Sequence, residues 1–284
     1  MKFTQYIRLI VVGVLWSLAG CIEPVSLELG SGQSDFVVFG WLTNQDEQYQ
    51  ISLTKSNGFN DREAYPLVND AQVYVYSGSG ARYRFVEEKN SGIYFPEDDG
   101  FIGEVGESYL LYVIVEEDTL VSTTEYLMPL PKIDSSFVSF VVDPSRFEVQ
   151  ENQANYYVSA MIQDQPNVRN YFRWKVYVNG VLRNTPSELV LFDDLFLDGN
   201  RFRVDANNVL FKKGDSVSVV QYSLSEQAYN YYVQLKGQTD NSTLTPNAKP
   251  SILEGNISSL SSPEIQVFGY FGASEAQVVS GIQQ

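Results

Sequence analysis

The chain has 284 residues, with 35 acidic and 19 basic side chains and no histidine, so its formal net charge is −16. A surface this acidic repels phosphate backbones, which argues against a nucleic-acid partner. Without histidine the chain cannot use Ser-His-Asp or Cys-His catalysis, nor a zinc site with histidine ligands. The 19 tyrosines and 17 phenylalanines suit half-buried strands and favour a β-rich fold.

The start of the chain has the features of a secretory signal. Two basic residues, Lys2 and Arg8, precede an apolar run that ends at Leu18. The run is shorter than the roughly 20 residues of a membrane-spanning helix, but it fits a signal peptide. The sequence Leu18-Ala19-Gly20-Cys21 resembles the lipobox of bacterial lipoproteins, in which the cysteine receives the lipid. We therefore expect residues 1–20 to be removed and Cys21 to carry acyl chains such as palmitate.

Cys21 is the only cysteine of the chain. Secreted domains that rely on disulfides carry cysteines in pairs, so a single cysteine at a cleavage site favours lipid attachment. Two or three acyl chains would hold the protein on a membrane almost permanently, whereas one chain binds only marginally. An ordinary signal peptide with a cysteine nearby is the alternative interpretation.

Residues 21–34 end in glycine and serine and are expected to form a flexible tether. Between residues 35 and 128, short apolar or alternating runs are separated by turn residues, as in successive strands. These runs are 36–42, 49–53, 71–76, 82–87, 93–95, 109–115 and 120–128. The last two are expected to pair as a hairpin across Glu116-Glu117-Asp118-Thr119. Together the runs predict an N-terminal β-sandwich over 35–128.

Pro129 and Pro131 cannot donate hydrogen bonds to a sheet, so we place a domain boundary between them and the first domain. The second domain, 129–284, contains further runs that resemble strands. These are 137–142, 156–162, 174–178, 181–182, 189–196, 216–222 and 265–271. The pair Asn179-Gly180 stands between two of them and predicts a hairpin turn, because both turn residues must accept positive φ. The second domain is therefore expected to be β-rich too.

One amphipathic helix is predicted near 224–236. Ser223 and Glu226 have the spacing of a capping box, and Lys236 with Gly237 forms a typical helix end. The residues that share its apolar face are Leu224, Ala228, Tyr231, Tyr232 and Leu235. Tyr229 and its two tyrosine neighbours could bind a ligand, but an aromatic stripe on such a helix more often packs against a core.

Oxygen-bearing side chains gather in one short segment, Asp193-Asp194 followed by Asp198-Gly199-Asn200. Calcium takes oxygen ligands of this kind, but the spacing does not match an EF-hand loop. A solvated acidic turn is the favoured interpretation, so we predict neither a metal nor a cofactor.

The chain offers no pattern of catalytic residues. Carboxylate pairs such as Glu87-Glu88, Asp98-Asp99 and Glu116-Glu117 are adjacent in sequence, so on strands they would point to opposite faces. A glycosidase needs two carboxyl groups that face one cleft. Trp41 and Trp174 stand in strongly apolar runs and are expected in the core rather than on a sugar-binding surface.

Two short segments, Asp118-Thr119-Leu120 and Asp215-Ser216-Val217, resemble the acceptor motif for O-glycosylation of exported proteins in Bacteroidota. The motif implies that Thr119 and Ser216 are modified. Thr119 is the better candidate because we expect it on an exposed hairpin turn.

The order of features along the chain resembles a family of Bacteroidota outer-membrane lipoproteins described only as a domain of unknown function. Besides the lipobox, the matching segments are Val37–Asn44, Gly92-Ile93-Tyr94, Met128–Ser135, Gly255-Asn256-Ile257 and Phe268–Ser274. The resemblance implies a transthyretin-like or carboxypeptidase-regulatory β-sandwich in the N-terminal half. It also implies a cell-surface accessory lipoprotein, encoded beside SusC-type TonB-dependent transporters, with such a β-barrel and other surface lipoproteins as partners.

The leading functional hypothesis is thus a non-enzymatic accessory subunit of an outer-membrane transport complex. Two alternatives remain open. One is a free-standing surface module that binds glycan or peptide. The other is a hydrolase that uses two carboxylates brought together by the fold.

Overall fold

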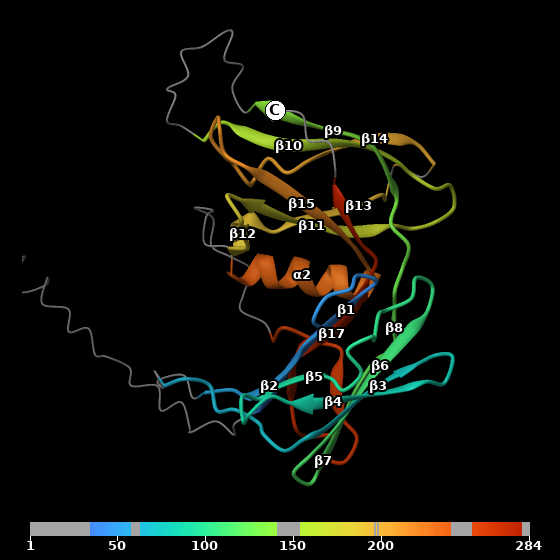
Figure 1. The fold of residues 1–284 in the computed structure, drawn as a ribbon, viewed down its shortest axis with the longest axis vertical. Coiled ribbons are helices and arrows are strands. Elements are labelled where there is room, and N and C mark those ends of the chain that lie inside the picture. The colour runs from blue at the N-terminus through green and yellow to red at the C-terminus, as the bar shows by residue number, and fades with distance from the viewer. Residues whose placement is uncertain are drawn as a thin grey trace, which may run out of the picture. The chain divides into compact units, whose positions relative to one another are not determined.

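Strands make up most of the regular structure in this computed structural model, which describes residues 35–57, 63–140, 154–195, 197, 199–239 and 252–279 (Figure 1). These residues all belong to one unit, formed by 34–57 and 62–284. The predicted signal peptide, Cys21 and the tether lie outside the described residues. The predicted β-rich fold with one amphipathic α-helix is confirmed.

The largest sheet has ten strands, in the order β16-β7-β6-β3-β4-β5-β2-β1-β17, with β8 pairing β6 as well. The strands are β1 (Phe36–Thr43), β2 (Ile51–Lys55), β3 (Gln72–Ser77), β4 (Arg82–Glu87), β5 (Ile93–Pro96), β6 (Ser108–Val115), β7 (Asp118–Ser122), β8 (Glu125–Tyr126), β16 (Ile257–Ser259) and β17 (Val267–Ser274). All neighbours are antiparallel except β1 and β17, which are parallel. Two strands from beyond Pro131 therefore complete the sheet built by residues 35–128.

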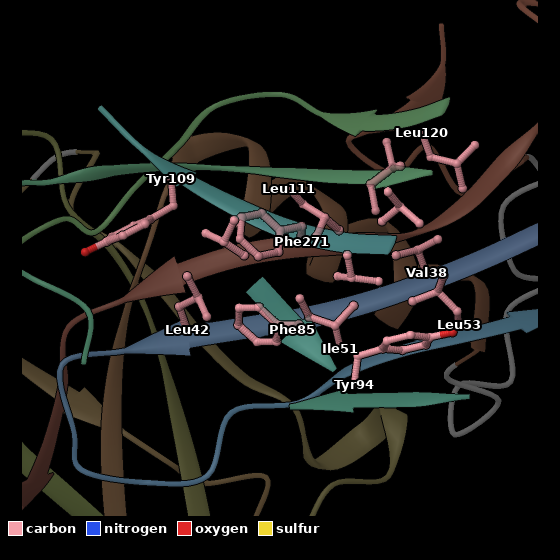
Figure 2. Packing of buried hydrophobic residues seen from close by; sticks show 14 of the residues in the cluster. Val38, Leu42, Ile51, Leu53, Phe85, Tyr94, Tyr109, Leu111, Leu120 and Phe271 are labelled. Atoms are coloured by element: carbon pink, nitrogen blue, oxygen red, sulfur yellow. The ribbon is translucent and has the colours of Figure 1, made fainter. Parts of the chain in front are cut away.

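The core of this sheet follows from the alternation of its strands. In β3, for example, Val73 and Val75 are fully buried while the residues between them are not. Phe271 of β17 lies among Val38, Leu111 and other buried side chains of the cluster (Figure 2). Although β17 ends the order of strands, it contacts β16, β7 and β6 near the other end. The sheet is thus curled around a single core.

The side chain of Asn256 joins the two ends of this curled sheet. Its Nδ2 donates to the carbonyl oxygen of Phe271 at 2.8 Å, and its Oδ1 accepts from the amide of Phe271 at 2.9 Å. Its own carbonyl oxygen accepts from the amide of Thr123, just after β7, at 2.7 Å. The amide group therefore takes the place that a neighbouring strand would fill beside β17. We call this contact the Asn256 bridge.

Two smaller sheets enclose a second core. One has the order β14-β10-β9, and the other the order β12-β11-β15-β18 with β13 also pairing β11. Their strands are β9 (Lys132–Phe140), β10 (Tyr156–Gln163), β11 (Tyr171–Val178), β12 (Val181–Arg183), β13 (Val190–Asp193), β14 (Arg201–Asp205), β15 (Val217–Leu224) and β18 (Ala276–Val279). A short 3-10 helix, η1 (Pro186–Glu188), precedes β13. One apolar cluster takes Val158 and Ile162 from the first of these sheets and Phe172, Trp174 and Val219 from the other.

The α-helix, α2, runs from Glu226 to Thr239 and begins later than predicted. Ser225 caps it, since its Oγ accepts from the amide of Ala228 at 3.0 Å. Ser223 is instead a strand residue of β15, and its Oγ accepts from the amide of Glu275 at 2.8 Å. The helix also continues past Gly237. The capping box was wrong because the pairing of β15 with β11 holds Ser223 in the sheet.

One hairpin turn has the predicted residues, and a second turn is shorter than predicted. Asn179 and Gly180 both have positive φ, 51° and 77°, and connect β11 to β12 as predicted. Between β6 and β7, Val115 already pairs with Asp118, so the turn is Glu116-Glu117 alone. Asp118 extends the strand because its buried carboxylate accepts from Ser259 Oγ at 3.2 Å. The run predicted over 120–128 forms two strands, β7 and β8, and the short strands β14, β16 and β18 were not predicted.

Candidate functional site

Three tyrosines line the solvent side of β3 and β6. Tyr74 and Tyr76 alternate with the buried residues of β3, and Tyr112 lies directly opposite Tyr74 on β6. The rings of Tyr76 and Tyr112 meet edge to face at 6.1 Å between centroids, and those of Tyr74 and Tyr76 are 6.4 Å apart. All three are half-buried by one another, so their rings form an ordered aromatic surface.

Two arginines extend this surface onto β4. Arg84 pairs with Tyr74 and Arg82 with Tyr76 in the strand register, which places all of them on one side of the sheet. The guanidinium of Arg82 lies 5.2 Å from the centre of the Tyr74 ring. Both arginines are exposed, although the chain as a whole is strongly acidic. We call these five residues the tyrosine–arginine face.

A hollow of about 640 Å³ adjoins this face at the end of β4. Its lining residues are Tyr74, Arg82, Tyr83, Arg84, Pro96, Glu97, Asp98 and Phe101. Tyr83 and Phe101 pack against each other with ring centres 4.2 Å apart, and Arg84 forms an exposed ion pair with Glu97 at 3.4 Å. Aromatic rings and guanidinium groups together can stack on a planar or apolar surface and donate hydrogen bonds to carboxylates or hydroxyls. The arrangement is suited to binding. The two carboxylates of the hollow, Glu97 and Asp98, do not share a hydrogen-bond partner.

A buried carboxyl group, Glu125, lies beside the Asn256 bridge. It is 1% exposed, and its Oε1 accepts from Tyr270 Oη at 2.5 Å and from Asn256 Nδ2 at 3.4 Å. Burial raises the pKa of Glu125, and hydrogen bonds from Tyr270, Ser225 and Asn256 offset part of that rise. Burial likewise raises the pKa of the Tyr270 hydroxyl. This cluster fixes β8 against β17 and is closed to solvent.

The raised pKa of Glu125 predicts a pH dependence of stability. In the unfolded chain Glu125 has an ordinary carboxyl pKa of about 4.3. In the folded state it therefore stays protonated at pH values where the unfolded chain has already lost this proton. Stability should therefore fall as the pH rises through that range towards the folded-state pKa. The variant Glu125→Gln cannot ionise, so relative to it the unmodified chain should lose stability between about pH 4 and pH 7. Urea unfolding at both pH values measures this; the exposed Glu117→Gln is the control and should follow the unmodified chain.

A second group of buried charges lies on β11. Arg173 donates to Asn184 Oδ1 and stacks 4.6 Å from the ring of Tyr232, while Lys175 lies 4.1 Å from the ring of Tyr222. Burial, together with the charge of Arg173, lowers the pKa of Lys175 to about 8. The stacking of both cations on tyrosine rings indicates a packing role.

The tyrosines of α2 pack rather than form a ligand surface. Tyr231 and Tyr232 are buried in a cluster with Tyr270, against which Trp41 also packs. Burial raises the pKa of Tyr231 to about 12. Tyr229 is half-buried, and its hydroxyl donates to Asp193 Oδ2 at 3.0 Å. Trp174, as predicted, is a core residue.

Asp193, the last residue of β13, and its neighbour Asp194 both pair with Arg169 but differ in burial. Asp193 pairs with Arg169 at 3.2 Å and with Tyr229, whereas Asp194 is 2% exposed. Burial raises the pKa of Asp194, a hydrogen bond from Asn170 opposes that rise, and the charge of nearby Asp164 adds to it. Asp198 lies outside the described residues. Among the described residues, no group of three or more acidic, cysteine or histidine side chains is placed to hold a metal.

The comparisons with known proteins agree with one part of the sequence interpretation. Residues 22–278 match the family described as Domain of unknown function (DUF4249). The chain belongs to this family. No curated protein matches it. Among solved structures, a DUF4785 family protein from Legionella pneumophila matches with 10% identity and a TM-score of 0.25, over 66% of this chain and 51% of that one. The match thus spans about half of the Legionella protein.

The two glycosylation candidates of this DUF4249 protein differ in exposure. Thr119 lies within β7 rather than on the expected turn, and it is half-buried because its amide and carbonyl bond to Ser261 and Leu260. It faces the same side of the sheet as Tyr112, since Ile114 is its partner on β6. Ser216 is exposed just before β15. Modification of either residue stays a prediction.

Sequence reasoning missed the tyrosine–arginine face of the DUF4249 chain. The sequence does contain a pattern typical of such a face, because tyrosines stand at positions 74 and 76 and arginines at positions 82 and 84. Only the strand register shows that these alternations lie on one side and adjoin Tyr112. No helix in the described part of the chain is long and apolar enough to cross a membrane.

Proposed function

We propose that this protein is a lipid-anchored, non-enzymatic accessory subunit of a bacterial outer-membrane transport complex. In this proposal Cys21 anchors it at the cell surface, and the tyrosine–arginine face docks on a SusC-type TonB-dependent β-barrel. The lipobox and the order of motifs support the location and the class of partner. The observation that carries a binding role is the ordered row Arg84–Tyr74–Tyr112 across three strands.

Physical reasons favour this face as the contact surface. Tyrosine and arginine are enriched in protein interfaces, because they bury a large area with little loss of conformational entropy and still form hydrogen bonds. The rings already pack on one another, so little further ordering is needed on binding. The two arginines also offer positive charge on a chain that elsewhere repels acidic partners.

A double variant tests the proposed docking. Tyr74→Ser with Tyr112→Ser should leave the fold intact, because both rings are on the solvent side, but should weaken retention of the β-barrel partner by about 30-fold or more. The measurement is purification of the native protein in mild detergent, followed by mass spectrometry of the retained proteins. Tyr65→Ser removes a tyrosine that is 66% exposed elsewhere and is the matched control. Equal retention by both variants, or no barrel with the unmodified protein, would contradict the proposal.

The hollow beside Tyr74 supports a second candidate, a free-standing glycan- or peptide-binding module. Its rings and guanidinium groups could hold one sugar unit or one side chain without a protein partner. A glycan and peptide array with the full chain distinguishes the two. Saturable binding that the Arg82→Ala variant abolishes, without a barrel partner, would favour the module.

A further inference from the structure

Three oxygen-bearing side chains lie together at one end of the second core. On β11 and β13, Phe172 pairs with Phe192, so Asn170 and Asp194 face each other two residues further along, on the same inward side. Hydrogen bonds extend the ladder to this pair, because Asp194 N donates to Asn170 O at 3.3 Å and Asn170 N to Asp194 Oδ2 at 2.8 Å. Ile162 of β10 is buried in the same core. Asp164 follows it by two residues, so we expect its side chain to point the same way.

All three side chains are buried, and each has an oxygen that accepts no hydrogen bond from the described residues. Asp164 and Asp194 are 2% exposed and Asn170 is 5% exposed. These oxygens are Asp164 Oδ1, Asn170 Oδ1 and Asp194 Oδ1, the last of which forms only a long ion pair with Arg169 at 3.4 Å. A buried polar atom that makes no hydrogen bond destabilises the fold, so three such atoms in one part of the core require an explanation.

The protein balances only part of the negative charge at this place. Arg169 Nε approaches Asp194 Oδ1 at 3.4 Å, but it is one-third exposed and also pairs with Asp193. Asp164 receives only the amide of Gly199, which donates to its Oδ2 at 2.7 Å. Two carboxylates that are buried close together are stabilised by a bound cation or by a shared proton.

We propose that Asp164, Asn170 and Asp194 form a calcium site, with main-chain carbonyls and water as its further ligands. Calcium takes six to eight oxygen ligands and accepts neutral amide oxygens beside carboxylates, whereas magnesium keeps most of its water. Two carboxylates match the charge of one divalent cation. The third side-chain ligand is the neutral amide of Asn170, so the site contains two acidic side chains rather than three. Asp193, which the sequence placed beside Asp194, is left out because both its oxygens accept hydrogen bonds from the protein, whereas Asp164, Asn170 and Asp194 each keep one oxygen that accepts none.

Terbium, which replaces calcium and emits when excited through nearby aromatic rings, tests the site on the full chain. Tyr171 and Trp174 are the neighbouring residues that would absorb. We expect emission that saturates with terbium chloride and is displaced by calcium but not by magnesium. For the unmodified chain, calcium at about 100 times its dissociation constant should raise the unfolding midpoint by about 5 °C relative to EDTA. An equal midpoint in both solutions would overturn the proposal.

The variants Asp164→Asn and Asp193→Asn separate this site from general surface charge, because each removes one carboxylate from the same region. Asp164→Asn should abolish the terbium emission and the response to calcium, yet remain folded in EDTA by circular dichroism. Asp193→Asn should keep both signals. An equal loss in both variants, or a crystal grown with calcium that shows only water between the three side chains, would show that no calcium site exists.

Discussion

Replacing Asn256 by alanine is expected to lower the free energy of unfolding by about 2 to 5 kcal/mol. The change removes both hydrogen bonds of the Asn256 bridge and leaves the amide and carbonyl of Phe271 without partners. Phe271 is fully buried, so water cannot replace those bonds without opening the curled sheet. Each orphaned group costs about 1 to 3 kcal/mol. Urea unfolding followed by tryptophan fluorescence measures the loss.

The matched control for this substitution is Asn207→Ala. Asn207 is exposed near the end of β14, and its loss should change stability by no more than about 0.5 kcal/mol. If Asn256→Ala were as stable as this control, the ends of the curled sheet would be held by apolar packing alone.

The variant Cys21→Ser is expected to transfer nearly all of the protein from the membrane fraction to the soluble fraction. The hydroxyl cannot accept the diacylglycerol, and each buried methylene of an acyl chain contributes about 0.8 kcal/mol of membrane affinity. No other attachment is expected, because the acidic surface disfavours adsorption on anionic lipid. Fractionation of the cells and immunoblotting measure the distribution.

Ser26→Ala in the predicted tether is the control and should stay with the membrane. If Cys21→Ser also stayed there, a lipid on this cysteine would not be the anchor. The docking variant Tyr74→Ser with Tyr112→Ser should remain membrane-bound, so anchoring and partner binding can fail independently.

Part of the proposed calcium site could be recognised from the sequence alone. The acidic segment around Asp194 drew attention to oxygen ligands, but the partners that matter, Asp164 and Asn170, are 30 and 24 residues away in sequence. Likewise Tyr74 and Tyr112 belong to strands that only the register makes neighbours. Sequence adjacency even misled, because Asp193 accepts hydrogen bonds from the protein at both carboxylate oxygens and is not part of the proposed site.

The sequence by itself determined the β-rich class, the individual strands with clear alternation, the Asn179-Gly180 turn and the buried face of the helix. Each of these depends on residues within a few positions of one another, where periodicity and backbone preference act directly. Only the tertiary structure decided that β16 and β17 return to the first sheet, that Ser225 rather than Ser223 begins the helix, and that Asp164, Asn170 and Asp194 are all buried. Those outcomes depend on which strands pair, and pairing over long separations is decided by the burial of the whole chain rather than by local pattern.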